Sequence, residues 1–362
     1  MLIDANRPAQ ITLSERMKYR AAHSVLNNAQ NIAIFMHEGV DGDCLGSAYG
    51  LKALCQQMGK NAYVCLPGGE YNKTLDVIDR TPDDNEIPSQ NADLCVIVDG
   101  SYEHLAPIAK QLYDKYVSNG AKTLCFDHHL YNSNTCQQNC VIDRSSAAEV
   151  LYEMCKTVAI IPKQAAANNI LVGLVSDSQM GQTGKSTDNT RKYIRELGNI
   201  CDNLDAITAN YNYRTPGEQK LLDVLLKNST DLGDGISYSH CSINDVINCE
   251  VDFEAVKGMM KYYKSEANTD LAILSCGPFE KDIYDPNYDG APLYYVRMQS
   301  STRKTRPILE PYGGRGHEYA AWCKVIADNP DEVFKQVKGM LDRYKSKNSD
   351  FAAPKLDYYC KL

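Results

Sequence analysis

Short apolar runs alternate with helical patterns along the first half of the chain. Four runs are compact and bounded by polar turns, as strands buried on both faces tend to be: NIAIFM, NAYVCL, DLCVIVD and TLCFD. Between them, CLGSAYGLKALCQQMG, residues 105–117 and SSAAEVLYEMCKTV carry apolar residues at helical spacing. Strands that alternate with helices predict a parallel sheet with helices on both faces, whose ligand site lies at the carboxyl ends of the strands.

The pattern changes after a long helical stretch over residues 187–213. Beyond it, ISYSHCSI, DLAILSCG and LYYVRMQS are typical of strands, and residues 252–264 and 330–344 of helices. The sequence therefore predicts an α/β protein in which an N-terminal parallel-sheet domain is joined by a helical linker to a smaller C-terminal α/β domain. The predicted parts are residues 1–186, 187–215 and 216–362.

Composition is that of an ordinary soluble protein with room for two domains: 362 residues, 43% hydrophobic and 23% charged. No apolar run is long enough to span a bilayer and the N-terminus lacks a secretory signal, so we expect a cytoplasmic protein without a membrane partner. The 14 cysteines are scattered without a CxxC pair, which favours reduced, buried thiols. A net charge of −8 argues against binding long duplex nucleic acid, but it allows a small anionic substrate if metals supply positive charge.

Acidic and imidazole side chains follow the carboxyl ends of three predicted strands. They are His37, Asp41, Asp43, Asp99, Asp127, His128 and His129. Asp177, after the apolar run ILVGLVS, can join them. Each residue alone is explained by a turn, a helix cap or an exposed surface. Together, carboxylate oxygens and imidazole nitrogens suit Mn²⁺ or Mg²⁺, and they suffice for two ions about 3.5 to 4 Å apart, an arrangement that hydrolyses phosphoesters.

The segment GQTGKST, residues 181–187, looks like the end of a phosphate-binding loop. Such a loop needs a glycine five positions before its Gly-Lys pair, and this position is Gln179. The sequence instead predicts a polar turn that caps a helix beginning around residues 186–188. Asp177, just upstream, is then the functional residue of this stretch.

Four segments, HEGVDGDCLGS, IVDGS, FDHH and LVGLVSDS, resemble in order the successive motifs of the DHH phosphoesterase superfamily. YGGRGHEYAAW resembles the glycine, histidine and Ala-Ala signature of the associated DHHA1 domain, so the resemblance spans nearly the whole chain. It implies two Mn²⁺ ions, with Mg²⁺ or Co²⁺ as substitutes. The implied ligands are His37, Asp41 and Asp99 for one ion, and Asp43, Asp99, His128 and Asp177 for the other, with Asp99 bridging.

Other residues near these motifs have predicted supporting roles. Asp127 is expected to orient a histidine, because imidazole ligands usually donate their second N–H to a carboxylate. His129 is expected to contact phosphoryl oxygens. Ser145, Ser146 and Glu149 stand at the start of a predicted helix, where either an anion or simple capping explains them.

The second domain is expected to select the substrate. Gly313, Gly314 and Gly316 allow close backbone approach, and His317 begins HEYAAWCKV, which we predict as a helix whose N-terminus favours an anion. A local basic cluster consists of Arg297, Arg303, Lys304, Arg306 and Arg315; Tyr312 and Tyr319 are candidates for base stacking. A glycine turn, core tyrosines and solvated charges are the alternative. Arg315 replaces the family's usual third glycine and Trp322 the glycine after Ala-Ala, which affects substrate preference.

The resemblance implies a manganese-dependent phosphodiesterase or phosphatase, similar to oligoribonucleases, phosphoadenosine-phosphate phosphatases and RecJ-like domains. Expected substrates are short single-stranded RNA, linear dinucleotides such as pApA, cyclic dinucleotides or a nucleotide phosphate. The enzymatic alternative is a manganese-dependent inorganic pyrophosphatase or exopolyphosphatase. A non-catalytic nucleotide-binding protein is the third interpretation, and a homodimer is compatible with all three.

Overall fold

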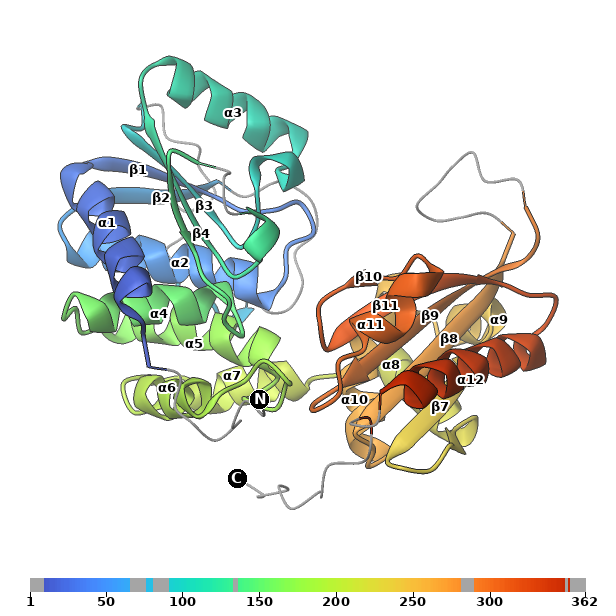
Figure 1. Ribbon diagram of the computed structural model, residues 1–362. Coiled ribbons are helices and arrows are strands. Elements are labelled where there is room, and N and C mark those ends of the chain that lie inside the picture. Colours follow the sequence, from blue (N-terminus) through green and yellow to red (C-terminus); the bar gives the residue numbers. More distant parts are fainter. Residues whose placement is uncertain are drawn as a thin grey trace. The chain divides into compact units, whose positions relative to one another are not determined.

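The computed structural model describes residues 10–65, 76–80, 91–132, 136–280, 290–348 and 351. The chain divides into two compact units, Met1–Tyr213 and Arg214–Leu362 (Figure 1). Helices α6 (Asp188–Gly198) and α7 (Leu204–Asn212) fall in the first unit, and the sequence-based division into domain, linker and domain stays a prediction. No helix among these described residues is long and apolar enough to cross a membrane. The described cysteines are free thiols and most are buried, as expected.

The first unit contains a five-stranded parallel sheet of order β2-β1-β3-β4-β5, which confirms the predicted fold class. Its strands are β1 Asn31–Phe35, β2 Asn61–Cys65, β3 Leu94–Val98, β4 Lys122–Asp127 and β5 Gln138–Val141. All five residues of β3 are buried, as the continuous apolar run predicts. β5 was not predicted.

Helices cover both faces of this sheet (Figure 1). They are α1 Leu13–Asn28, α2 Gly42–Gln57, α3 Pro107–Ser118, α4 Ala147–Thr157, α5 Gln164–Ser178, α6 Asp188–Gly198 and α7 Leu204–Asn212. Alternate strand residues face opposite layers: Ile32 and Ile34 join the core of α1, α2, α4 and α5, whereas Ala33 and Phe35 pack under α3. The predicted helical stretch over 187–213 contains the two helices α6 and α7, and α1 was not predicted.

Two glycines let α2 and α5 cross at close range. A Cβ atom on Gly46 would lie 2.2 Å from the backbone nitrogen of Gly173 and 2.6 Å from the carbonyl oxygen of Asn169. A Cβ atom on Gly173 would lie 3.0 Å from Oδ1 of Asp43. This contact therefore sets the separation of the two helices that carry Asp43 and Asp177.

We expect Gly46→Ala to lower the free energy of unfolding by about 1–3 kcal/mol, because the added methyl group meets backbone that has no room to move. Urea denaturation measures this loss. Gly258→Ala is the matched control: Gly258 is exposed in a helix of the second unit, a Cβ there meets nothing within 4 Å, and alanine favours the helix by up to ~1 kcal/mol. Equal effects of the two substitutions would show that the α2–α5 contact is not tightly packed.

The second unit is built on a mixed six-stranded sheet of order β10-β11-β9-β8-β7-β6, in which only β7 and β8 are parallel among the described pairs. The strands are β6 Thr230–Asp231, β7 Ile236–Cys241, β8 Leu271–Phe279, β9 Leu293–Ser300, β10 Arg315–Gly316 and β11 Ala320–Ile326. The helices are α8 Pro216–Lys227, α9 Ile243–Asn248, α10 Phe253–Glu266, α11 Arg306–Leu309 and α12 Pro330–Lys347. One face packs on α11 and α12, and the other on α8, α9 and α10.

The predicted helix over HEYAAWCKV is wrong. Residues 320–326 form strand β11, which pairs antiparallel with β9. Its residues alternate between half-buried and buried until Ile326, which is exposed, and this is the period of a strand. The two adjacent alanines favour a helix locally, but pairing with β9 and burial of Ala321, Cys323 and Val325 outweigh this preference.

Candidate metal centre

The carboxyl ends of β1, β3 and β4 bring the predicted acidic and imidazole residues together. His37 follows β1, and its segment is held by a bridge to Leu105. Asp41 caps α2 and Asp43 lies in its first turn. Asp99 directly follows β3, and Asp127 ends β4 just before His128 and His129. Asp177 joins them from the last turn of α5.

Asp99 lies between two histidines. Its Oδ2 is 3.5 Å from Nε2 of His37, and its Oδ1 is 3.4 Å from Nε2 of His128. Two ligands bound to one ion at about 2.1 Å are separated by roughly 3 to 3.5 Å, so these spacings suit a shared cation better than direct hydrogen bonds. Oδ1 of Asp99 is buried and accepts no hydrogen bond from any residue that the structure describes. The backbone of Asp99 is left-handed, with φ of 53°, a conformation that aspartate and asparagine tolerate.

The other carboxylates surround the same two histidines. Nε2 of His128 lies 3.6 Å from Oδ2 of Asp177 and 4.0 Å from Oδ2 of Asp43. Nε2 of His37 lies 4.0 Å from Oδ1 of Asp41. Asp43, His128 and Asp177 place one possible ligand atom each within 4.8 Å of one another. Two overlapping sets of hard ligands, both reaching Asp99, are thus present.

The crowded charges shift the acid–base properties of the cluster. Burial lowers the pKa of His128, but contact with Asp99 and the charges of Asp177 and Asp43 raise it to about 10. Burial and the neighbouring carboxylates raise the pKa of Asp177 to about 8 and move that of Asp43 well above its usual value. The pKa of Asp99 is lowered, because His128 and His37 outweigh its burial. Such mutual repulsion is what a bound divalent cation relieves.

Backbone N–H groups at the N-terminus of α4 bind the buried side chain of Asp43. Oδ2 accepts a hydrogen bond of 2.6 Å from the backbone N–H of Ala147, and Oδ1 one of 3.0 Å from Ala148. Ser146 caps α4, and the hydroxyl of Ser145 donates to Glu149; both serines are buried. The geometry favours the capping interpretation over the substrate contact expected for Ser145 and Ser146, because the helix amides bind an internal carboxylate.

Asp127 orients the two histidines that follow it. Its Oδ1 accepts from the backbone N–H groups of His128 and His129, and lies 2.8 Å from Nδ1 of His129. Its Oδ2 accepts from Asn132. Nδ1 of His128 lies 3.1 Å from the backbone carbonyl oxygen of Arg144, which directs Nε2 toward the acidic cluster. Sequence reasoning missed Arg144, because a backbone carbonyl has no side-chain signature.

GQTGKST forms the predicted turn and helix cap, not a phosphate loop. The backbone N–H of Gly181 donates to the hydroxyl of Ser178, and Thr187 caps α6. Nζ of Lys185 lies 3.4 Å from a carboxylate oxygen of Asp143. The segment therefore ends α5 just after Asp177 and starts α6.

Several members of the basic cluster predicted in the second unit contact other residues of that unit. Arg303 is buried, with its guanidinium 5.1 Å from the ring of Phe351, its Nε 3.5 Å from Asp270 and one N–H donated to the carbonyl of Asp234. The guanidinium of Arg303 is therefore enclosed by residues of its own unit, and its substrate contact stays a prediction. Lys304 and Arg306 lie near glutamates, at 2.7 Å and 3.8 Å. Arg315 is exposed, and Arg297 is half-buried.

Backbone conformation and close packing explain the glycines of YGGRGHEYAAW. Gly313 and Gly316 have φ of 74° and 120°, which favours glycine. A Cβ atom on Gly314 would lie 2.6 Å from the backbone of Leu309. The exposed His317 donates its backbone N–H to the carbonyl of Ala320 in the turn before β11. The turn thus presents Arg315 and His317 to solvent on a tight backbone.

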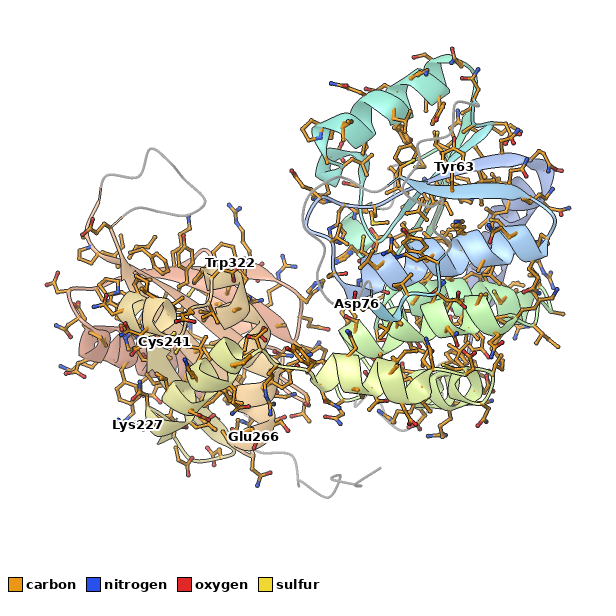
Figure 2. All side chains as sticks on the ribbon, turned by 180° about the vertical axis from the view of Figure 1, so that it is seen from behind. Tyr63, Asp76, Lys227, Cys241, Glu266 and Trp322 are labelled. Carbon is orange, nitrogen blue, oxygen red and sulfur yellow. The ribbon has the colours of Figure 1, made fainter. Side chains whose placement is uncertain are left out.

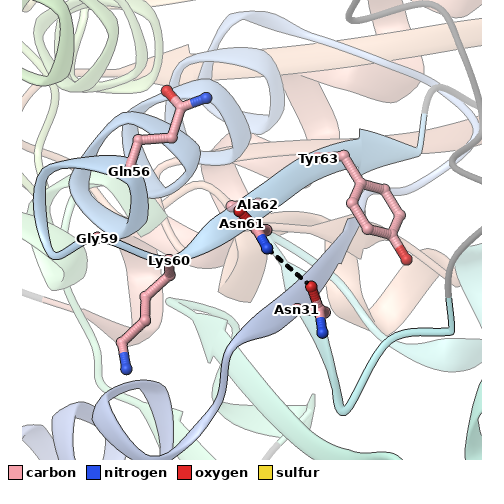
Figure 3. Close-up of a pocket in the computed structure, with 7 residues that line it drawn as sticks. All are labelled: Asn31, Gln56, Gly59, Lys60, Asn61, Ala62 and Tyr63. Atoms are coloured by element: carbon pink, nitrogen blue, oxygen red, sulfur yellow. Dashed lines mark hydrogen bonds between the residues drawn. The ribbon is translucent and has the colours of Figure 1, made fainter.

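A polar hollow lies at the other end of the sheet, where β1 and β2 begin (Figure 3). It is lined by Asn31, Gln56, Gly59, Lys60, Asn61, Ala62 and Tyr63. Asn61 donates a 3.0 Å hydrogen bond to Asn31, and Lys60 donates to the carbonyl of Asn27. The lining contains no acid or histidine, unlike the cluster at the carboxyl ends of the strands.

Comparison with known proteins agrees with this arrangement. Residues 31–175 match the DHH family, N-terminal domain. No curated protein matches the sequence significantly. An exopolyphosphatase-related protein from Bacteroides fragilis has a similar structure, with a TM-score of 0.70 at 17% identity over 92% of this chain and 97% of that chain. This likeness shows a shared fold.

Two further structures are more distant. A putative family II inorganic pyrophosphatase of Methanococcus jannaschii has a TM-score of 0.44 at 14% identity, over 86% of this chain and 99% of that chain. RecJ of Thermus thermophilus, in complex with Mn²⁺, has a TM-score of 0.46 at 13% identity, over 95% of this chain and 57% of that chain. Likenesses this weak support no functional argument.

Proposed function

We propose that this chain, which carries a DHH-family N-terminal domain over residues 31–175, is a two-metal phosphoesterase acting on short nucleotide substrates. The substrates are short oligoribonucleotides, linear or cyclic dinucleotides such as pApA, or nucleotide phosphates. The position of Asp99, with one oxygen near His37 and the other near His128, carries the proposal. The many buried free thiols fit a reducing cytoplasm.

The donor set fits two Mn²⁺ ions, with Mg²⁺ or Co²⁺ as substitutes, because it combines hard oxygens with imidazole nitrogens around a buried, unsatisfied carboxylate oxygen. We assign His37, Asp41 and Asp99 to one ion, and Asp43, Asp99, His128 and Asp177 to the other. When bound, the ions supply the positive charge that holds a phosphoryl group and makes water a nucleophile at neutral pH.

The remaining residues position these groups and the substrate. Asp127 and the carbonyl of Arg144 fix the ring orientations of His129 and His128. We assign the second ring nitrogen of His129 to a phosphoryl oxygen. In the second unit we assign Arg297, Gly314, Arg315, Gly316 and His317 to the nucleotide.

A direct test offers the purified protein with Mn²⁺ a panel of phosphoesters in parallel: pApA, cyclic dinucleotides, short and long RNA, phosphoadenosine phosphate, pyrophosphate and polyphosphate. We expect the short nucleotides to have the highest kcat/KM. Preference for pyrophosphate or polyphosphate would establish the alternative activity, whose metal chemistry is the same. If the protein binds manganese stoichiometrically but hydrolyses none of these substrates, the result would support a non-catalytic nucleotide-binding protein.

We expect Asp177→Asn to reduce both manganese content and hydrolysis, since the amide replaces a negative ligand near His128. Loss of a partner that supports a metal typically costs 10–100-fold, and loss of a ligand should cost at least that. Metal analysis and steady-state rates measure both effects. Lys185→Ala is the control, because Lys185 lies in the turn and its side chain is near Asp143. The metal content of this variant should be normal. Tight ATP binding that disappears only in the Lys185 variant would contradict this view of GQTGKST.

A further inference from the structure

One sheet face of the second unit gathers aromatic and basic side chains. Residues directly opposite each other on antiparallel strands project to the same side. Trp322 of β11 is opposite Arg297 of β9 and Arg315 of β10, and Lys324 is opposite Tyr295. Their neighbours along β11, by contrast, are buried in the core under α12.

Trp322 lies beside a cluster of other aromatic rings. It is the only tryptophan of the chain and is half-buried (Figure 2). Its ring centroid lies 6.0 Å from that of Tyr295, at an interplanar angle of 50°. Tyr295 in turn contacts Phe253 at 5.2 Å and Phe279 at 5.1 Å. The indole is therefore a supported ring at the margin of an aromatic cluster, and little side-chain freedom remains to be lost when a ligand binds.

Three basic residues stand on the strands of this face, although the chain carries −8 overall. Strands β9, β10 and β11 contain Arg297, Arg315 and Lys324 and no acidic residue. Outside the strands, Lys304 and Arg306 lie close to glutamates. Aromatic rings with adjacent cations are the combination that binds unpaired nucleotides, because the ring stacks on the base and the cations attract phosphate.

We propose that Trp322 is the stacking platform for a base of the nucleotide substrate, with Arg297 and Arg315 taking the phosphate groups beside it. The inference rests on the proposed function in that the substrate is a nucleotide. It also separates the candidate substrates, since pyrophosphate and polyphosphate have no base to stack. Removing one stacked base typically weakens binding by about tenfold to a hundredfold.

The single tryptophan makes the contact directly measurable. Intrinsic fluorescence of the full chain carrying Asp99→Asn, which should not turn over substrate, is followed in Mn²⁺ during titration with pApA, ribose 5-phosphate or pyrophosphate. We expect saturable quenching by pApA alone. If the wild type hydrolyses pApA but pApA does not quench the variant, the inference is wrong and the proposed function stands. If pApA quenches the variant but the wild type does not hydrolyse it, the proposed function is wrong and the base contact of Trp322 stands.

Substitutions separate stacking from packing. With Trp322→Leu, calorimetry should show pApA binding weakened about tenfold to a hundredfold, while bound Mn²⁺ and the binding of pyrophosphate stay unchanged. Trp322→Phe should recover most of the affinity, because a phenyl ring still stacks. Equal losses for pApA and pyrophosphate, or no recovery with phenylalanine in a variant whose thermal unfolding is normal, would show that Trp322 serves only the fold.

Discussion

Asp99→Asn should abolish phosphoester hydrolysis and leave the fold intact. Both proposed ions share this carboxylate, and the neutral amide supplies one oxygen in place of two charged ones. We expect a rate loss of at least ~10³-fold, equivalent to about 4 kcal/mol of transition-state stabilisation. Asparagine is the right replacement because it adopts the left-handed backbone at φ of 53° more readily than alanine does. Steady-state rates and bound manganese are the measurements.

Asp93→Asn is the matched control for this prediction. Asp93 lies just before the same strand, at its opposite end, where it accepts hydrogen bonds from the backbone of Gln30 and Asn31. Its substitution should leave rate and manganese content unchanged. If Asp99→Asn keeps more than a tenth of the wild-type rate, a loss of less than ~1.4 kcal/mol, the assignment of a bridging carboxylate is wrong.

Glu153→Ala should lower the free energy of unfolding by about 3–5 kcal/mol. Glu153 is buried in α4; its Oε2 accepts from the hydroxyl of Tyr19 at 2.6 Å and from Nε of Arg144 at 2.8 Å, and its Oε1 from Tyr193 at 3.2 Å. Alanine would leave the Arg144 guanidinium, which also contacts Glu15, without its buried partner. Urea denaturation measures the effect.

The same change should reach the metal centre, because the backbone carbonyl of Arg144 holds His128. We therefore expect weaker manganese binding in the folded variant. Glu196→Ala is the control: Glu196 is partly exposed, pairs with Lys156 at 2.7 Å and accepts from Tyr152, and such surface pairs contribute about 0–1 kcal/mol. A loss below about 1 kcal/mol for Glu153→Ala would show that this network does not stabilise the first unit.

The layout of the candidate metal centre follows from local features of the sequence. Five-residue apolar runs specify buried parallel strands, and parallel strands place their carboxyl ends at one edge. Acids and histidines that come directly after those runs must meet there, as His37, Asp99 and His128 do. The parallel sheet and its helical layers were predictable for this reason, and so was the turn formed by GQTGKST.

Other features depend on contacts between distant segments. Arg303 looked like one more exposed cation, but Asp270, Asp234 and Phe351 enclose it. Residues 320–326 form a strand because their backbone pairs with β9, although their two alanines favour a helix.

The sequence by itself determined which chemical groups stand at the ends of the strands, because each lies next to the apolar run that places it. Only the tertiary structure decided how these groups are held. The helix amides that bind Asp43, the carbonyl that orients His128 and the crossing of Gly46 over Gly173 come from segments distant in sequence. Backbone donors, backbone acceptors and missing side chains leave no pattern in the order of residues, so their partners become visible only when the chain is folded.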